Sequence, residues 1–328
     1  MAKKHYLLTP GPTPIPEEIA KVMAEPIIHH RTAQYMEFVK NVNENLKKIF
    51  KTKANVLVFT SSGTGAMEAS VVNTLSAGDT AIVIRGGKFG ERFAEICEAY
   101  GVKVRPIDIE WDGAPEPAEV ESALRKNPET KAVFTQLCET STASVYDIKS
   151  IAQVVGKTGA ILVVDVISGL GSDEFNMDEW GVDIAVGGSQ KAFMIPPGLS
   201  FSAVSKKAWN LVKSSKLPKY YYDFNKYEKL IEKSDSPWTP AITLFIGLEK
   251  ALSMIIEEGV DEFIKRHASD AEFVRKSAKE LGLRLFSRFP SNAVTAINVP
   301  EGVDGEKLVS SLKSKGVTFA GGQDYLKG

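Results

Sequence analysis

Short apolar runs alternate with helical segments through the middle of the chain, and this alternation limits the fold more than any other feature. The apolar runs cover residues 56–59, 81–84, 102–107, 132–137, 161–164 and 184–186. Helical patterns separate them, at residues 65–76, 88–100, 117–126 and 148–157. Strands alternating with helices form βαβ units, whose parallel strands are buried on both faces. The sequence therefore predicts an α/β fold with a mainly parallel sheet and helices on both faces.

The flanking segments extend this sheet and begin a helical layer. Residues 9–16 form a proline-rich stretch that predicts a stiff loop, followed by a helix that starts at Pro16. Apolar residues at helical spacing predict an amphipathic helix over residues 33–50. The apolar stretch 199–204 follows two prolines and a glycine, and we expect it to close the sheet as an antiparallel strand.

The last third of the chain predicts a smaller α+β domain. Its expected elements are a long helical segment at 241–281, strands at 283–286 and 293–299, a helix at 304–315 and a strand at 317–320. Residues 214–238 are rich in Lys, Tyr and Asp and predict a surface excursion. The predicted division is an N-terminal arm (1–20), a large domain (21–240) and a small domain (241–328). We expect the small domain to be incomplete, because no closing element follows its last strand.

Composition and charge narrow the class of protein. The 328 residues are 43% hydrophobic and 25% charged with a net charge of −1, which is typical of a globular protein without a nucleic-acid partner. Neither a signal peptide nor an apolar run of 18 residues occurs, so we expect a cytoplasmic protein with no membrane contact. Cys97 and Cys138 have no metal-ligand spacing, and the sequence predicts neither a metal site nor a disulfide framework.

Candidate chemistry lies at the carboxyl ends of the predicted strands, where parallel sheets bind ligands. Thr60-Ser61-Ser62-Gly63-Thr64-Gly65 follows the first strand and opens a helix. Small residues let the backbone approach a ligand closely, and the first N–H groups of a helix face outward, so this loop suits a phosphate. A helix cap with a tight turn would have the same composition.

Asp165 follows the fully apolar strand 161–164, where an unpaired carboxylate is expensive to bury. A pyridinium N–H would pair with it and let the ring act as an electron sink. The alternative is an aspartate that caps the next turn.

Lys191 follows the strand 184–186 in the small-residue loop Gly187-Gly188-Ser189-Gln190-Lys191. A lysine in a partly dry site can lose its proton and attack an aldehyde, although most lysines are solvated surface charges. Because Lys191, Asp165 and the loop at 60–65 are expected at one edge of the sheet, together they predict bound pyridoxal 5′-phosphate, with Lys191 as its Schiff-base lysine.

Two further loops are expected at this edge. Phe89 could stack on the cofactor ring, or it could belong to the core. Glu139-Thr140-Ser141-Thr142 follows the strand 132–137 and offers hydroxyl groups, or caps the next segment.

These motifs occur in an order that resembles a known family. Thr9-Pro10-Gly11-Pro12, Ser62-Gly63-Thr64-Gly65, Glu139-Thr140-Ser141-Thr142, Asp165-Val166-Ile167-Ser168 and Gly188-Ser189-Gln190-Lys191 look like those of the class V aminotransferases of PLP fold type I. The similarity is greatest to the alanine–glyoxylate, serine–pyruvate and serine–glyoxylate aminotransferase group, and it runs over essentially the whole chain.

The resemblance implies a role for each motif. Lys191 would be the Schiff-base lysine and proton shuttle, and Asp165 would pair with the pyridine nitrogen. The other implied cofactor contacts are Ser62, Gly63 and Thr64 at the phosphate, Gln190 at the phosphate or ring hydroxyl, Phe89 at the ring, Thr140 or Ser141 at the ring hydroxyl, and Ile167. Trp238 and Thr239 would reach the phosphate of a neighbouring subunit, which implies a homodimer with its site at the interface. Gly11 and His30-Arg31 would border the substrate.

One departure from the family pattern concerns substrate binding. Family members carry an arginine near the C-terminus that grips the substrate carboxylate, and this sequence ends at Gly328 before such a stretch. A bidentate arginine is the expected way to orient a carboxylate. We therefore expect a truncated chain, or another arginine in this role, with cofactor binding retained and transamination weakened.

The resemblance implies a ping-pong transaminase that moves an amino group from alanine or serine to glyoxylate or pyruvate by way of pyridoxamine phosphate. A desulfurase or another lyase of the same fold is one alternative, but neither cysteine is placed on a flexible loop. A PLP-binding scaffold subunit with weak activity is a second, because some relatives are labelled hydrogenase-associated subunits. A nucleotide-binding protein is a third, but the chain has neither Gly-x-Gly-x-x-Gly with a following acid nor a Walker sequence.

Overall fold

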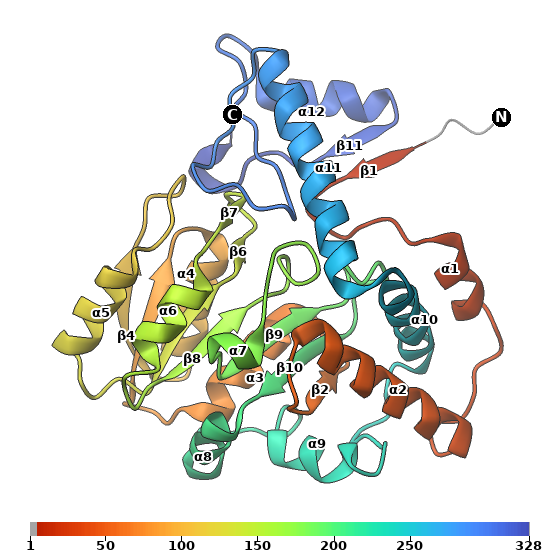
Figure 1. Ribbon diagram of the computed structural model, residues 1–328, viewed down its shortest axis with the longest axis vertical. Coiled ribbons are helices and arrows are strands. Elements are labelled where there is room, and N and C mark those ends of the chain that lie inside the picture. The colour runs from red at the N-terminus through yellow and green to blue at the C-terminus, as the bar shows by residue number, and fades with distance from the viewer. Residues whose placement is uncertain (1–4, 328) are drawn as a thin grey trace.

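A seven-stranded sheet forms the centre of the protein in the computed structural model, which describes residues 5–327 (Figure 1). The strand order is β2-β10-β9-β8-β5-β3-β4. The bounds are β2 Val56–Phe59, β10 Ser200–Val204, β9 Ile184–Gly188, β8 Ile161–Asp165, β5 Ala132–Gln136, β3 Thr80–Arg85 and β4 Lys103–Asp108. The sheet confirms the predicted α/β class, and each of its seven strands lies within two residues of the bounds that the sequence predicts.

The sheet is parallel except for β10, which pairs antiparallel with both β2 and β9. The predicted antiparallel closing strand is therefore confirmed, although it lies between β2 and β9 rather than at the edge. The other six strands run in one direction, so their carboxyl ends meet along a single edge of the sheet. This edge carries the loops in which the sequence places candidate chemistry.

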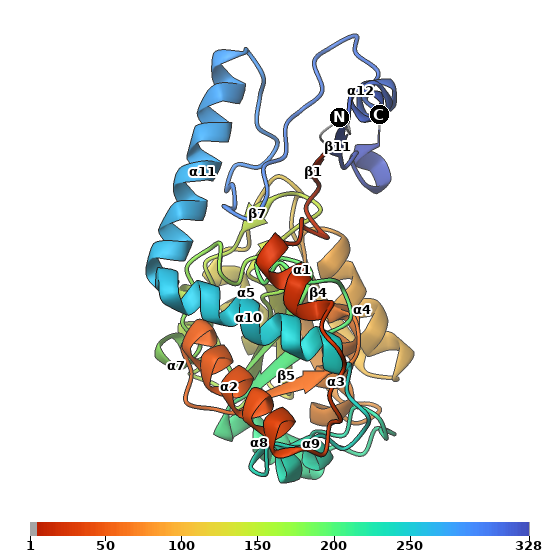
Figure 2. The same ribbon diagram turned by 90° about the vertical axis from the view of Figure 1, so that its right-hand side faces the viewer.

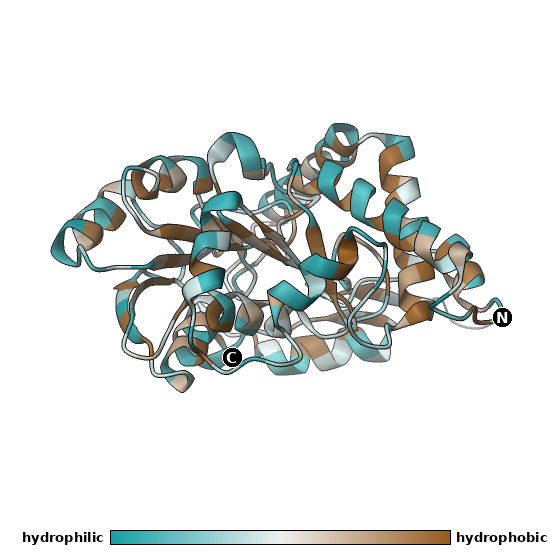
Figure 3. Cartoon of the chain, turned by 90° about the horizontal axis from the view of Figure 1, so that it is seen from below, coloured by the Kyte–Doolittle hydropathy of each residue, from teal (hydrophilic) through white to brown (hydrophobic). Residues whose placement is uncertain are grey.

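Helices cover both faces of the sheet, as predicted. One face packs on α2 (Ala33–Phe50), α5 (Pro117–Lys126), α6 (Ile148–Val155), α7 (Met177–Trp180) and α10 (Ile242–Glu258). The other face packs on α3 (Gly63–Thr74), α4 (Lys88–Ala99), α8 (Lys206–Ser214) and α9 (Phe224–Ile231). Hydrophobic residues fill the central strands, whereas the hydrophilic residues lie mainly on the outer helices and loops (Figure 3).

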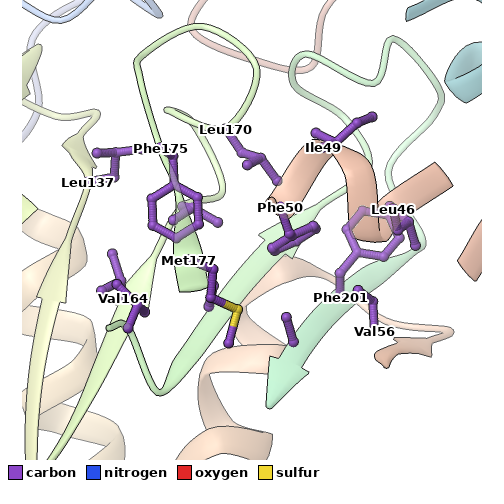
Figure 4. Packing of buried hydrophobic residues seen from close by; sticks show 14 of the residues in the cluster. Leu46, Ile49, Phe50, Val56, Leu137, Val164, Leu170, Phe175, Met177 and Phe201 are labelled. Atoms are coloured by element: carbon purple, nitrogen blue, oxygen red, sulfur yellow. The ribbon is translucent and has the colours of Figure 1, made fainter. Parts of the chain in front are cut away.

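Alternation along each strand divides the core between the two faces. In β8, Leu162 and Val164 belong to one cluster, and Ile161 and Val163 belong to the other. Figure 4 shows part of the first cluster, which includes Phe175 and in which Phe50 of α2 lies beside Phe201 of β10. The sheet is therefore buried on both faces, and its carboxyl edge is the place where the loops between strands and helices emerge.

The C-terminal part extends above the sheet on the long helix α11 (Figures 1 and 2). It contains α11 (Val260–Glu280), α12 (Gly305–Ser314), β11 (Val317–Phe319) and a short 3-10 helix (Asp324–Leu326). The N-terminal strand β1 (Tyr6–Leu8) pairs in parallel with β11, with Tyr6 opposite Val317. The chain then descends through α1 (Glu17–Met23), which packs on α10. The N-terminal arm therefore connects the C-terminal part to the sheet.

Four predictions about the outer elements are wrong or incomplete. The segment 241–281 is two helices rather than one, because Gly259 has a φ of +92° that ends α10. The expected strands at 283–286 and 293–299 are reduced to one bridge between Leu285 and Ile297, since no sheet lies beside them to pair with. Residues 214–238 are not wholly a surface excursion, because α9 buries Phe224 and Tyr227 against β2. Neither β1 nor the short hairpin of β6 (Cys138–Glu139) and β7 (Ser144–Val145) was predicted.

Within residues 5–327, no helix combines the length and the apolar character needed to span a bilayer.

Candidate active site

The loops that follow β2, β8 and β9 meet at the carboxyl edge of the sheet. Gly63 opens α3 so close to Ile167 that a Cβ atom at position 63 would overlap the Ile167 side chain. A Cβ atom at Gly188 would lie 3.2 Å from both Ile167 Cγ2 and Gln190 Oε1. The structure therefore brings together the predicted residues Gly63, Ile167 and Gln190, and the glycines leave room for their close approach.

The loop before α3 presents unpaired N–H groups at the start of a helix. Ser62 is the N-cap of α3, but its side chain makes no capping hydrogen bond and is exposed. Thr64 Oγ1 accepts a hydrogen bond of 3.3 Å from Arg92 Nη1 of α4. A helix N-terminus beside a guanidinium group attracts an anion, because both the helix dipole and the arginine carry positive charge.

Asp165 ends β8 with its carboxyl group almost fully buried, at 4% exposure. Asp165 Oδ1 accepts a hydrogen bond of 2.8 Å from Ile167 N. The pKa of Asp165 is raised to about 7, mainly by burial and to a smaller extent by Glu139, whereas the hydrogen bond from Ile167 lowers it. A cationic donor at the second oxygen would stabilise the carboxylate.

Lys191 follows β9 with a half-buried amino group. Lys191 Nζ donates a hydrogen bond of 2.7 Å to Pro10 O, and a Cβ atom at Gly11 would lie 2.7 Å from the same nitrogen. Burial lowers the pKa of Lys191, whereas Cys138 and Asp165 act in the opposite direction. A lowered pKa increases the neutral fraction of the amine, which is the form that attacks an aldehyde or accepts a proton.

The N-terminal arm holds the loop that carries Gln190 and Lys191. Thr13 N donates to Gln190 O at 3.1 Å, and Thr13 Oγ1 donates to Lys191 O at 2.9 Å. Gln190 Oε1 is buried without a hydrogen-bond partner among the described residues, and it therefore lies ready for a donor from a ligand.

The loops after β3 and β5 meet around the carboxylate of Glu139. Its oxygens accept hydrogen bonds from Phe89 N (3.1 Å), Gly90 N (3.0 Å) and Ser141 Oγ (2.6 Å). Thr140 Oγ1 lies 2.6 Å from Ser168 Oγ, in the loop after Asp165. The predicted residues Phe89, Thr140 and Ser141 thus lie together beside the loop of Asp165.

The remaining predicted residues gather near the end of β2. Arg31 Nη1 donates a hydrogen bond of 2.8 Å to Asp235 Oδ2, four residues before Thr239. Trp238 Nε1 donates to Tyr221 O at 2.9 Å, and Ala241 N donates to Thr60 Oγ1 at 3.2 Å. Arg31 is therefore paired with an acid of this chain, and within residues 5–327 it makes no hydrogen bond to Lys191 or Gly11.

Three residues that sequence reasoning did not assign belong to this arrangement. The sequence marks Glu139 only as part of the motif at 139–142 and predicts no role for it, yet its carboxylate is fully buried. Arg92 and Thr13 act through contacts with segments 28 and about 178 residues away along the chain. A buried acid directly after a strand was a usable signal for Glu139, whereas nothing local to Arg92 or Thr13 marks them.

Neither cysteine resembles a nucleophile. Cys97 and Cys138 are both buried, and burial raises the pKa of the Cys138 thiol well above its ordinary value. Burial likewise raises the pKa of Cys97 to about 12. A desulfurase needs an exposed, easily ionised thiol, so the geometry opposes that alternative.

Comparison with known proteins shows the family to which the chain belongs. The model of the family described as Aminotransferase class-V matches residues 5–326. The chain belongs to the class V aminotransferases. It is 39% identical to the soluble hydrogenase, small subunit, of Synechococcus sp. (strain PCC 6716), over 100% of this chain and 87% of the relative.

A second relative and a solved structure carry aminotransferase names. The chain is 36% identical to the L-aspartate–glyoxylate aminotransferase of Paracoccus denitrificans (strain Pd 1222), over 100% of this chain and 85% of that protein. The crystal structure of an alanine–glyoxylate aminotransferase from Nostoc sp. has a TM-score of 0.95 and 26% identity, covering 100% of this chain and 89% of the other. Transaminase activity and the type I fold follow from this family membership.

Class V aminotransferases depend on pyridoxal 5′-phosphate, and the described residues fit that cofactor. Gly63 and Gly188 let Ile167 and Gln190 approach the N-terminus of α3 closely, where the helix dipole and Arg92 favour a phosphate. Asp165 offers a buried carboxylate to a ring N–H, and Gln190 offers an unpartnered oxygen. Lys191 offers an amine of lowered pKa to the aldehyde.

Proposed function

We propose that this class V aminotransferase moves an amino group from a small neutral amino acid, alanine or serine, to glyoxylate or pyruvate by a ping-pong sequence. The observation that carries the proposal is that Lys191, whose burial lowers its pKa, and the buried Asp165 share one sheet edge with the helix N-terminus at Gly63. An amine, a carboxylate and an anion site at one sheet edge match the aldehyde, ring nitrogen and phosphate of the cofactor.

Each residue has a separate task in this proposal. When bound, pyridoxal 5′-phosphate supplies an aldehyde and a ring that withdraws electrons from the substrate α-carbon. Lys191 Nζ holds the aldehyde and, once free, accepts the α-proton and returns it. Asp165 holds a proton on the ring nitrogen, because its buried carboxylate favours a cationic partner. Ser62, Gly63 and Thr64 hold the phosphate at the N-terminus of α3.

The substrate class rests on the relatives. The Paracoccus protein is named for aspartate and glyoxylate, and the Nostoc structure for alanine and glyoxylate. Glyoxylate is common to both names, so we propose it as the preferred acceptor. The N-terminal loop with Gly11 lies against Lys191 Nζ and leaves little space there, which supports a small donor.

We also propose that two copies of the chain complete the site. Type I aminotransferases generally act as dimers. Arg31, Trp238 and Thr239 share one region of this chain through the Arg31–Asp235 ion pair. Tyr220 is 71% exposed and stacks on Trp238, which provides an apolar surface suited to a second copy. In the dimer, Thr239 would reach the partner's phosphate and Arg31 would border the substrate.

A second candidate function is a cofactor-binding subunit of a larger complex. The relative from Synechococcus is named as a small subunit of a soluble hydrogenase, and this name favours the possibility. Such a subunit would bind pyridoxal 5′-phosphate but would not exchange amino groups at a useful rate.

The half-reactions test the proposal and separate the two candidates. We expect the visible absorbance of the bound cofactor to bleach with alanine or serine and to recover with glyoxylate. Colour that persists with every amino acid would support the subunit and refute the transaminase.

Lys191→Ala is the decisive variant. We expect it to lower turnover by at least about a thousandfold, because both the anchoring amine and the proton acceptor are lost. The exposed Lys149→Ala serves as a matched control and should retain the rate of the wild type. Wild-type activity in Lys191→Ala would refute the assignment.

A further inference from the structure

The first turn of α4 is capped from another strand. Its N-cap residue, Gly87, has no side chain, and no side-chain cap of its own satisfies the N–H groups of Lys88, Phe89 and Gly90. Ser141 Oγ accepts from Lys88 N at 3.0 Å, and Glu139 Oε2 accepts from Phe89 N and Gly90 N. Both acceptors come from the β5–β7 region, about 50 residues further along the chain. The start of α4 is therefore positioned by Glu139 and Ser141.

Glu139 uses its two oxygens for two different loops. Oε2 faces α4, and Oε1 accepts from Ser141 N at 3.2 Å and from Ser141 Oγ at 2.6 Å. A Cβ atom at Gly87 would lie 2.6 Å from Glu139 Cγ, so a glycine is needed there for the carboxylate to approach. The carboxylate thereby joins Phe89 and Gly90 to Ser141.

The donor set fixes the chemistry at position 139. Glu139 is fully buried, and burial raises the pKa of its carboxyl group, whereas the hydrogen bonds from Ser141, Gly90 and Phe89 lower it. Each of these partners donates a hydrogen atom, so they all require an acceptor. A glutamine would fill the same space. Its NH₂ group, which is a donor, would however face other donors, either the N–H groups of Phe89 and Gly90 or the N–H and O–H groups of Ser141. Position 139 therefore requires a side chain with two hydrogen-bond acceptors, which a carboxylate provides and an amide of the same volume does not.

We infer that Glu139 is a positioning residue for the proposed reaction, because its carboxylate holds Phe89 at a fixed place relative to Thr140 and Ser141. This inference rests on the proposed function, in which those three residues contact the cofactor ring. Glu139 itself touches no reacting atom in this scheme. Its role is to set the orientation of an aromatic face and two hydroxyl groups that lie on different loops.

Glu139→Gln tests the inference through the cofactor rather than through turnover. The visible-region circular dichroism of bound pyridoxal 5′-phosphate reports how the ring is held. We expect Glu139→Gln to lose at least half of this signal at saturating cofactor and to bind the cofactor about tenfold more weakly, which is the size expected for a lost charged acceptor. Glu139→Asp, which keeps the carboxylate but shortens its reach by one methylene and alters no proposed cofactor contact, should lie between Glu139→Gln and the wild type.

Asp147→Ala is the matched control, because it removes the N-cap of α6, where Asp147 accepts from Ser150 N. It should lower the thermal midpoint and leave the cofactor signal and affinity unchanged. A merely structural Glu139 would make Glu139→Gln behave like Asp147→Ala, and that result would overturn the inference. If Glu139→Gln does not fold, Glu139→Asp decides, and an unchanged cofactor signal and affinity in Glu139→Asp would then overturn the inference. Since neither readout requires catalysis, a wild type that binds the cofactor without transaminating would refute the proposed function alone.

Discussion

The buried carboxylate of Asp165 destabilises the folded chain when it is charged and has no cationic partner. Burial raises its pKa to about 7, whereas an exposed aspartate titrates at 3.8. Below pH 3.8 both the folded and the unfolded chain bind this proton. Between pH 3.8 and pH 7 the unfolded chain releases this proton while the folded chain keeps it. The free energy of unfolding therefore falls as the pH rises, and the total loss reaches about 4 kcal/mol at and above pH 7. The charge is costly until a cation pairs with it.

Asp165→Asn removes this cost, since an amide carries no charge to bury. The cofactor-free variant should be more stable than the cofactor-free wild type by about 2–4 kcal/mol at pH 8, with the difference approaching zero at pH 4. Urea unfolding at the two pH values measures it, and the exposed Glu121→Gln should show no such dependence. The same variant should bind the cofactor more weakly. Equal stability of variant and wild type at pH 8 would contradict the burial cost.

Single residues were predictable from the sequence where a strand end marks them. Asp165 ends the apolar strand β8 and Lys191 lies three residues after β9, so the general position of ligands in parallel sheets was enough to single them out. Glu139 met the same criterion, but its partners Phe89 and Gly90 lie on another loop, about 50 residues away. Its role depends on a contact in three dimensions that no local pattern contains.

At the scale of elements, strong periodicity gave good boundaries and weak periodicity did not. The helix at 117–126 was predicted to the residue, because Pro117 and an acidic first turn mark its start. The strands expected at 283–299 failed, since apolar residues such as Ile297 and Val299 alternate there but remain partly exposed, at 39% and 38%. Alternation shows that a strand is possible, and a neighbouring strand is needed to form it.

Gly259 separates α10 from α11 and explains why one predicted helix is two. Its φ of +92° is strained for any residue with a Cβ atom, although a Cβ atom there would meet no close contact. Gly259→Ala should therefore destabilise the protein by about 1–2 kcal/mol, through the backbone alone. Differential scanning calorimetry measures the change. Gly159→Ala, on an exposed turn with open space around it, should be neutral, and equal midpoints for both variants would refute the argument.

At the scale of the whole molecule, the C-terminal part is attached to the sheet by a buried carboxylate. Asp173 lies in the loop after Asp165, and it accepts from Ser291 Oγ at 2.5 Å and from Asn292 N at 2.8 Å. Arg275 of α11 donates to Ser291 O and to Asn292 Oδ1, both at 3.1 Å. The backbone of the same segment bonds the turn at 143–145, directly after Thr140 and Ser141. The C-terminal part therefore supports the loop that carries candidate cofactor contacts.

Ser291→Ala should loosen this attachment. Asp173 is buried, and burial raises its pKa, so the loss of one donor leaves an acceptor without compensation and costs about 1–3 kcal/mol. Because the broken bond joins two parts of the fold, we expect the loss to appear first as faster hydrogen exchange in residues 287–292 and 140–145, with the central strands still protected. The exposed Ser311→Ala of α12 is the control. Uniformly faster exchange across the sheet would show that the C-terminal part and the sheet unfold as one unit, and would contradict a local attachment.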